Sequence, residues 1–492
     1  MNIRFILYVL GTLLLIEGGL LILPAIVTLI YDVHYSSPDV FSSIIEYLAP
    51  ILISSVITFS VGWILLYYNG NCSKIIGKRE GFIIVSVVWI VYSAFGALPF
   101  IISGSIPSVT NAFFEAMSGF TTTGYTILKN VEILPHGLLF WRSLMHFTGG
   151  IGILVLCLAV LPNFGVGSMN IYSAEISAAS LVGKISPRVK DTAKYISVIY
   201  IILTSLCMLL YLPDMNFFDA LCHAFSTTAT GGFSTKNASI GAFSEYSQWV
   251  AVVFMFFGST SFILLSYIWK RDFRKIIHND EFRFFIIVIL IASALVLTGL
   301  LLNSIETGKA ISEAVFNVVN IISTTGFASY DYKLTFPTLW FILFLLAFVG
   351  GCAGSTAGGM KIVRFILLFR LIPVQFRKMV HQNAIITVKL NNHHVNEDRM
   401  YNTLAFFMIF LCVYTGGVFL LMLSGFDFPS AVSASIACLA NLGQGFELSG
   451  TARHFSEIST VSKMICILLM LLGRLELYSI LILFSPSFWK KQ

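Results

Sequence analysis

The sequence predicts an all-α protein with many transmembrane helices. Of its 492 residues, 57% are hydrophobic and only 11% are charged, whereas soluble domains usually carry about 25% charged residues. Apolar runs of about 20 residues recur along the chain, and each is long enough to cross the roughly 30 Å hydrocarbon layer of a bilayer. An uncharged, glycine-containing motif stands between such runs four times. We therefore expect a polytopic helical fold with a fourfold internal repeat, because lipid cannot satisfy open strand edges.

Two apolar segments, 1–30 and 44–68, precede the repeats and are expected to form a transmembrane helix pair within residues 1–70. The first segment superficially resembles a signal peptide. Its apolar run is too long for one and it lacks a small-residue cleavage site. It is therefore expected to remain as the first span.

Each of the four repeats combines a span, a short semi-polar half-helix, a glycine loop and a second span. We place the repeats at 71–165, 166–275, 276–390 and 391–492. The first spans are expected at 82–103, 195–212, 283–302 and 402–424. The half-helices are expected at 110–121, 217–229, 311–323 and 429–440. The second spans are expected at 139–161, 248–268, 338–369 and 460–484, which gives ten full spans in all.

The basic residues indicate the topology. Most of the 30 Lys and Arg residues lie in 69–81, 162–194, 268–283, 361–400 and the two ends of the chain. The loops on the opposite side carry Lys129, Lys236, Lys309, Lys333 and Arg453. Because cytoplasmic loops are enriched in Lys and Arg, both termini are expected in the cytoplasm and the glycine loops toward the outside. The net charge of +6 then reflects topology rather than a nucleic-acid partner.

The four glycine loops have the composition of a cation pathway. They read SGFTTTGYT (118–126), STTATGGFST (226–235), ISTTGFAS (322–329) and ANLGQGFE (440–447). Carbonyl oxygens can replace the hydration shell of a monovalent ion, and glycine allows the backbone angles that turn carbonyls inward. The C-terminal, negative end of each preceding half-helix would favour a cation. A single such loop is more often a helix-packing bend, but four copies in one context favour a shared ring of carbonyls.

The third of the second spans contains the segment GGCAGSTAGGMK at 350–361. So many glycines should unwind a helix, and unwound backbone at membrane depth is tolerated where it lines a cavity or is buried in protein. We interpret this segment as a gate on the cytoplasmic side of the glycine loops. A tight crossing of helices through small residues is the alternative. The gate candidates are Gly350, Gly351, Gly354, Ser355, Thr356, Ala357, Gly358, Gly359 and Lys361.

Arg474 lies in the last apolar span, where an arginine is costly unless it is paired or faces a polar cavity. Its expected partners are the carbonyls of 350–359, and an ion pair with Glu447 or another acid is the alternative. Glu115, Asp219 and His223 precede two of the glycine loops. They would either shape the electrostatics and relay protons or simply orient the half-helices.

Several motifs together resemble the TrkH/TrkG branch of the bacterial potassium-uptake superfamily. They are EAMSGFTTTG (115–124), FWRSLMHFTGGIGILVL (140–156), ATGGFST (229–235), STTGF (323–327), GGCAGSTAGGMK (350–361) and LLGRLEL (471–477). The resemblance implies four M1–P–M2 units around one pore, a homodimer, a TrkA-like nucleotide-binding regulator in the cytosol, and a place in the bacterial inner membrane. It also implies that potassium is bound by Thr122, Thr123, Gly124, Thr230, Gly231, Gly232, Thr324, Thr325, Gly326, Asn441, Leu442 and Gly443.

The fourth loop departs from this pattern. Asn441 and Leu442 replace threonines, and Gln444 stands where many relatives have proline. The ring is therefore expected to be irregular and only modestly selective. Ala357 also interrupts the glycine run of the gate candidate, which would alter leak.

The expected function is potassium uptake through a gated, channel-like pore. A proton- or sodium-coupled symporter is the alternative, although the glycine loops contain no acid or histidine apart from Glu447 at the end of the fourth. An enzyme is not expected, because the spans contain no convergent cluster of acids, histidines and nucleophiles. Potassium would be the cargo, and no cofactor is expected.

Overall fold

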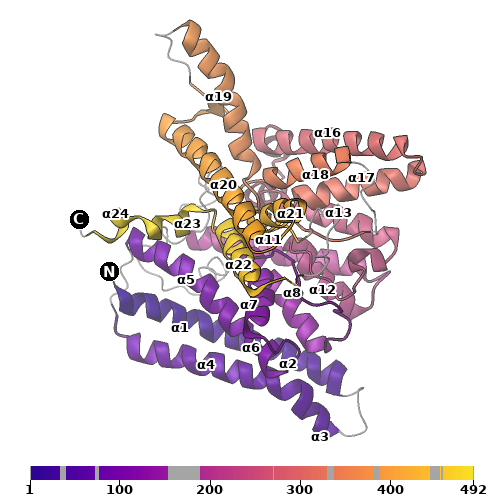
Figure 1. The fold of residues 1–492 in the computed structure, drawn as a ribbon, viewed down its shortest axis with the longest axis vertical. Helices are drawn as coiled ribbons and strands as arrows, with labels where there is room; N and C mark the ends of the chain where they lie inside the picture. Colours follow the sequence, from indigo (N-terminus) through magenta and orange to yellow (C-terminus); the bar gives the residue numbers. More distant parts are fainter. Residues whose placement is uncertain are drawn as a thin grey trace.

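The computed structural model is mostly helical, and its long helices surround a common centre (Figure 1). It describes residues 2–33, 40–72, 77–152, 189–269, 271–329, 337–381, 387–443, 455 and 458–490. Within these residues, six helices are long and apolar enough to cross a membrane, and up to eight if two bent helix pairs each count as one span. The polytopic helical fold that composition predicts is therefore confirmed.

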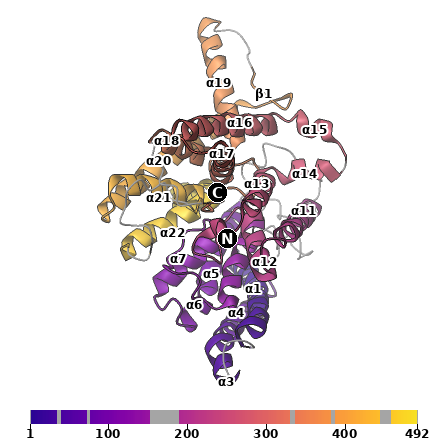
Figure 2. The same cartoon turned by 90° about the vertical axis from the view of Figure 1, so that its right-hand side faces the viewer.

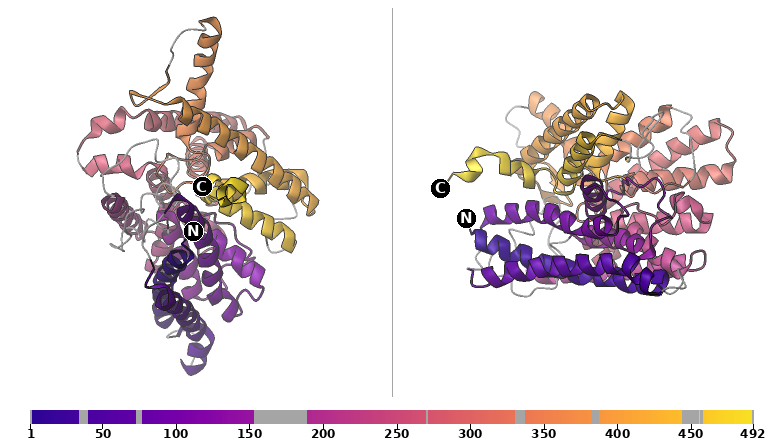
Figure 3. Two further views of the ribbon diagram at one scale, coloured as in Figure 1. Left: turned by 90° about the vertical axis from the view of Figure 1, so that its left-hand side faces the viewer. Right: turned by 60° about the horizontal axis from the view of Figure 1, so that its bottom comes forward.

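The N-terminal region forms an antiparallel helix pair along the outside of the first repeat (Figure 3). It contains α1 (Ile3–Leu20), α2 (Ile22–Thr28), η1 (Leu29–Val33), α3 (Val40–Ser43), η2 (Ile44–Leu48) and α4 (Ala49–Asn69). The two long helices approach closely because glycines face each other, and a Cβ on Gly11 would lie 2.9 Å from the carbonyl oxygen of Gly62.

The four repeats share one plan of span, half-helix and span. Repeat 1 has α5 (Lys78–Gly96), α6 (Leu98–Ile102), α7 (Val109–Phe120) and α8 (His136–Ile151). Repeat 2 has α11 (Val189–Tyr211), α12 (Phe217–Thr228), η4 (Ser239–Ala242), α13 (Glu245–Ser259), α14 (Phe262–Trp269) and α15 (Phe273–Ile277). Repeat 3 has α16 (Asp280–Leu302), α17 (Thr307–Ile322), α18 (Pro337–Val349) and α19 (Ile362–Val380). Repeat 4 has α20 (Glu397–Leu423), α21 (Phe428–Ala440), α22 (Thr460–Arg474), α23 (Tyr478–Leu481), η5 (Ile482–Phe484) and α24 (Pro486–Trp489).

A short hairpin connects repeats 3 and 4. Its strands are β1 (Lys389–Leu390) and β2 (His393–His394), and they pair antiparallel. The turn residues Asn391 and Asn392 both have positive φ, of 48° and 63°. This is the pattern of a two-residue type I′ turn, for which asparagine is well suited.

The repeats occupy successive positions around the middle of the molecule (Figure 2). Each half-helix packs against both spans of its own repeat. In addition, the second span of each repeat contacts the half-helix of the next, through the pairs α8–α12, α13–α17, α18–α21 and α22–α7. The last of these pairs joins repeat 4 to repeat 1, so the four repeats form a closed ring.

Two of the second spans are bent where the sequence suggests continuous helices. The spans expected at 248–268 and 460–484 are instead α13 with α14, bent by 106°, and α22 with α23, bent by 107°. At the first bend, Thr260 adopts an extended backbone. At the second, Glu476 and Leu477 have positive φ. Both spans are present but bent, because tertiary contacts at the centre override the local helical pattern.

The other second spans also stop at the centre. In repeat 3, α18 ends at Val349 and the 350–361 loop separates it from α19, as its glycines predict. In repeat 1, α8 ends at Ile151, and the rest of the expected span 139–161 lies outside the described residues. Both termini lie on the left side of the molecule in Figure 1, and α19 projects from its top in the same view.

Candidate ion-conduction site

The four half-helices end in the same local backbone. The first loop residue of each has a left-handed conformation, with φ of 53°, 53°, 57° and 55° at Thr122, Thr230, Thr324 and Asn441. The next amide then bonds back to the half-helix, as in Thr123 to Ser118 (2.9 Å). A β-branched residue rarely adopts positive φ. Three threonines in this conformation therefore indicate a backbone that the surrounding structure imposes, and such strain is concentrated at functional sites.

The glycine loops meet one another at the centre of the ring. A Cβ on Gly124 would lie 2.0 Å from the carbonyl oxygen of Gly231, and one on Gly232 would lie 2.2 Å from that of Thr325. A Cβ on Gly443 would lie 2.6 Å from the carbonyl oxygen of Thr123. The loops of repeats 4, 1, 2 and 3 are thus in consecutive contact. The space beside each of these glycines holds a carbonyl of the neighbouring loop.

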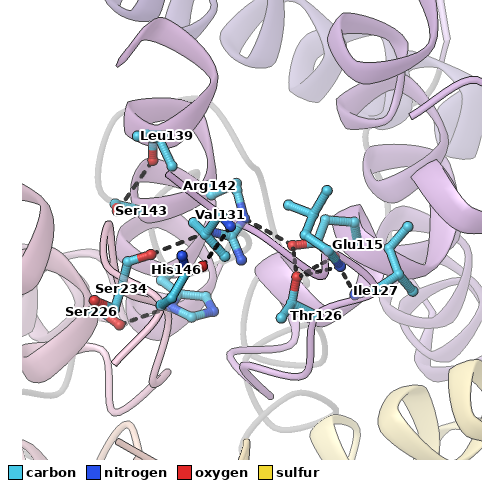
Figure 4. A network of polar contacts seen from close by, with 12 residues as sticks. Glu115, Thr126, Ile127, Val131, Leu139, Arg142, Ser143, His146, Ser226 and Ser234 are labelled. Carbon is cyan, nitrogen blue, oxygen red and sulfur yellow. Dashed lines mark hydrogen bonds and ion pairs between the residues drawn. The ribbon is translucent and has the colours of Figure 1, made fainter. Parts of the chain in front are cut away.

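A buried ion pair supports the first loop from behind (Figure 4). The Glu115 carboxylate accepts hydrogen bonds from Arg142 Nε (2.8 Å), Thr126 Oγ1 (2.9 Å) and Ile127 N (3.0 Å). The Arg142 guanidinium also lies 4.0 Å from the ring centroid of Phe233, in the second loop. This pair therefore fixes the backbone after the first loop and links it to the second.

Polar residues of α12 support the second loop. His223 Nε2 lies 2.8 Å from Ser234 Oγ, and Thr235 Oγ1 donates to the Asp219 carboxylate at 2.5 Å. The ring of His146, from α8, stacks on Phe233 with the centroids 4.1 Å apart. These contacts tie Asp219 and His223 of α12 to the second loop, which supports the role of orienting the half-helix over that of relaying protons.

The third loop is held by an amide as well as by a carboxylate, since Ser329 Oγ donates to Glu313 Oε2 at 3.1 Å. Asn320 Oδ1 accepts from Phe327 N at 2.9 Å, and its Nδ2 donates to the Phe327 carbonyl at 2.7 Å. The corresponding segment of the fourth loop, 444–450, lies outside the described residues, and so does Gln444. Sequence reasoning missed Arg142, His146 and Asn320. A charged residue within the apolar run 139–161 was the available signal for Arg142.

The 350–361 loop lies against the ends of three half-helices. Thr356 Oγ1 donates to the carbonyl of Thr228 (3.1 Å), Gly358 N to Thr324 Oγ1 (2.7 Å), and Gly359 N to the carbonyl of Ala440 (3.1 Å). These partners belong to repeats 2, 3 and 4. The loop therefore covers the inner end of the glycine loops.

The bent second span of repeat 2 provides backbone partners for the same loop. Cys352 N donates to the Ser259 carbonyl (2.9 Å), and Phe262 N donates to the Gly354 carbonyl (3.0 Å). Unwound backbone in an apolar environment must find such partners. The break between α13 and α14 and the 350–361 loop thus provide hydrogen-bond partners for each other's backbone.

Arg474 joins the loop to repeat 1. Its guanidinium donates to the carbonyl of Thr356 (3.1 Å), to Thr122 Oγ1 (3.3 Å) and to the carbonyls of Gly149 and Gly150. The structure therefore places Arg474 beside a carbonyl of 350–359. Glu447, the alternative partner, lies outside the described residues, and Glu476 pairs with Arg364 at 2.5 Å.

A cavity of about 90 Å³ separates the 350–361 loop from the ends of α8 and α22. Its walls include Trp89, Gly152, Gly354, Lys361, Asn441 and Arg474. Lys361 is only 6% exposed and its ammonium group donates to the carbonyl of Ala357 within the loop. The site thus consists of the glycine loops, a small cavity and the 350–361 loop beside it.

Comparison with known proteins decides the family. A family model described as TrkH, cation transport protein, matches residues 49–491. The chain belongs to the TrkH family. It is 36% identical to the Trk system potassium uptake protein TrkH of Escherichia coli K12 and 35% identical to that of Halomonas elongata, in each case over all of both chains.

A solved TrkH structure has the same fold. The crystal structure of the potassium transporter TrkH from Vibrio parahaemolyticus superposes with a TM-score of 0.87 at 33% identity, covering all of both chains. The resemblance stated from the motifs is therefore confirmed. Membership in a family of cation transporters also confirms the expectation of a transporter rather than an enzyme.

Proposed function

We propose that this chain takes up potassium across a bacterial inner membrane through a gated, channel-like pore. The carbonyls of 122–124, 230–232, 324–326 and 441–443 would replace the hydration shell of the ion. The observation that supports the proposal is the set of four left-handed turns, of which those of repeats 4, 1, 2 and 3 follow one another in consecutive contact. Its full-length relatives are named potassium uptake proteins, which supports potassium as the cargo.

The selectivity for potassium over sodium tests whether the four loops form a shared ring of carbonyls. In Gly443→Ser the new side chain would meet the carbonyl of Thr123, which lies 2.6 Å from the Cβ position. We expect the potassium-to-sodium flux ratio in proteoliposomes to fall. Gly416→Ser is the control, because no atom of the described residues outside the helix's own backbone lies within 4 Å of a Cβ there. An unchanged ratio in Gly443→Ser would argue against a shared ring.

The second part of the proposal is that the 350–361 loop is the gate, with Arg474 holding it closed. The loop lies against three half-helices and Arg474 bonds to its Thr356 carbonyl. Deleting 353–358 removes these contacts and should raise potassium leak in liposomes that lack any regulator. Lower or unaltered flux would contradict gating.

A proton- or sodium-coupled symporter is the second candidate. Lys361 and Glu476, which are titratable, line the cavity beside the 350–361 loop. Electrical recording separates the two functions. A reversal potential that follows only the potassium gradient supports a channel, whereas a displacement with pH supports proton coupling.

We further propose a homodimer with both termini in the cytoplasm and a TrkA-like cytosolic regulator. The basic segments 268–283 and 361–400 are its candidate docking surfaces. Flux of potassium, rubidium and sodium from purified protein, with and without the regulator, tests this assignment. Cross-linking in native membranes tests the dimer.

A further inference from the structure

The start of α16 touches the 350–361 loop through a buried carboxylate. Glu281, the second residue of this helix, is 1% exposed. Its Oε1 accepts a hydrogen bond from the backbone amide of Ala353 at 2.7 Å. Glu281 therefore holds the backbone of the loop at Ala353.

The preceding residue binds the β1–β2 hairpin. Asp280 Oδ2 accepts from Asn391 N at 2.9 Å and from Arg370 Nη1 at 2.9 Å. In return, Asn391 Oδ1 accepts from Asp280 N at 2.8 Å. Arg370 also donates to the carbonyl of Lys389 in β1. The tight turn of the hairpin is thus tied to the helix by reciprocal hydrogen bonds.

Asp280 and Glu281 are neighbours in the first turn of one continuous helix. Asn279 caps this turn, its side chain accepting from Phe282 N at 3.0 Å, so the two carboxylates keep a fixed relation to each other. A carboxylate that loses its buried donor is strongly disfavoured. A displacement of the hairpin therefore shifts Glu281 and disturbs its hydrogen bond to the backbone amide of Ala353.

We propose that Asp280 and Glu281 form a two-sided latch that couples the β1–β2 hairpin to the 350–361 loop. Glu281 is a positioning residue that keeps the loop closed, and Asp280 makes this position depend on the hairpin. The latch rests on the proposed gating function in one respect: it controls ion flux only if the 350–361 loop is the gate. The mechanical coupling itself does not depend on that function.

Hydrogen exchange in the full-length protein tests the latch directly. Glu281→Met removes the acceptor while keeping the side-chain length, and exchange within 350–361 should become about tenfold faster. Glu281→Gln keeps an acceptor oxygen and should remain close to the native rate. Asp214→Ala is the matched control, since that carboxylate holds Ser244 and Ser247 at the start of α13 and should leave exchange in 350–361 unchanged.

The decisive variant is on the hairpin. Asn391→Gly keeps the positive φ of the turn but removes the side chain that accepts from Asp280 N. The latch requires faster exchange in 350–361 although Asn391 makes no contact with that loop. Unchanged exchange there in Asn391→Gly would overturn the latch, even if Glu281→Met fails to fold.

Rubidium leak into regulator-free liposomes separates this inference from the proposed function. Faster exchange together with increased leak supports both the latch and the gate. Faster exchange with native leak supports the latch and contradicts gating by the 350–361 loop. The rubidium-to-sodium flux ratio should stay native in all these variants, because none of them touches the glycine loops.

Discussion

At the scale of single residues, the site depends on backbone shape rather than on charged side chains. Thr122, Thr230 and Thr324 adopt left-handed angles that their β-branched side chains disfavour. Loop glycines leave room for carbonyls of the adjacent repeat. The charged and amide groups lie behind the loops, where they fix the backbone without facing the ring.

Gly232→Ala tests this dependence. The added Cβ would lie 2.2 Å from the carbonyl of Thr325, at a φ of 89°. We expect potassium flux to fall by about tenfold or more, since such strain costs ~1–3 kcal/mol. Gly104→Ala carries similar backbone strain (φ 72°), but in the part of the chain that the structure describes no atom lies within 4 Å of its Cβ. Its flux should be native. Equal flux in the two variants would contradict the argument.

Glu17→Met is expected to stabilise the protein. Glu17 is 0% exposed, and within the described residues neither of its carboxylate oxygens has a hydrogen-bond partner. Replacing a buried, unsatisfied polar group with an apolar one of similar size should increase the free energy of unfolding by about 1–3 kcal/mol. Thermal unfolding in detergent measures the gain, and transport should be unaffected. A loss of transport would show that Glu17 has a functional role.

At the scale of elements, the second spans of the repeats are the parts that depart from simple helices. α13 and α22 stop at the level of the glycine loops and the chain then turns by 106° and 107°. In repeat 3 the same level holds the 350–361 loop. An unwound segment is stable here because neighbouring repeats supply hydrogen-bond partners for its backbone.

Thr356→Val tests how firmly the 350–361 loop is held. The single hydroxyl proton of Thr356 is shared between the carbonyls of Thr228 (3.1 Å) and Gly258 (2.9 Å), and the hydroxyl oxygen accepts from Thr230 Oγ1 (3.2 Å). Valine keeps the shape while removing the shared donated bond and the accepted bond. Because each lost hydrogen bond contributes about 1 kcal/mol to holding the loop in place, leak should rise by roughly tenfold or more. The control is Thr415→Val, because the Thr415 hydroxyl bonds only within α20 in the described structure. Native leak in Thr356→Val would mean that the other contacts are enough to hold the 350–361 loop in place.

At the scale of the whole molecule, the N-terminal helix pair contacts the ring of repeats through Asp32, which binds the start of α8. Asp32 accepts from the backbone amides of His136 (3.0 Å) and Gly137 (3.1 Å) and lies 2.8 Å from His136 Nδ1. These contacts cover the N-terminus of α8, where a carboxylate is favourable. The pair therefore supports repeat 1 from outside.

This attachment should depend on pH. The hydrogen bond to Asp32 raises the pKa of His136 above its usual value, with partial burial opposing it. Protonated His136 thus stabilises the fold below its unfolded-state pKa, and this contribution is lost as the pH rises through the raised pKa. The stability difference between the native protein and His136→Gln should shrink from pH 5.5 to 8.5, as followed by thermal unfolding. A difference independent of pH would contradict this assignment.

The sequence by itself determined the features that are local in the chain. Composition and apolar length predicted the transmembrane helices, and the repeated motif predicted four similar loops. The half-helix expected at 217–229 is observed as Phe217–Thr228. The glycines of 350–361 predicted the break in the third repeat, because so many of them cannot sustain a helix.

Only the tertiary structure decided which groups meet at the centre. It bends α13 and α22, brings Arg474 to three different segments and places Glu281 against Ala353, 72 residues away. No local pattern encodes these choices. They are set by where a buried backbone amide, carbonyl or charge finds its partner, and in this ring the partner belongs to another repeat.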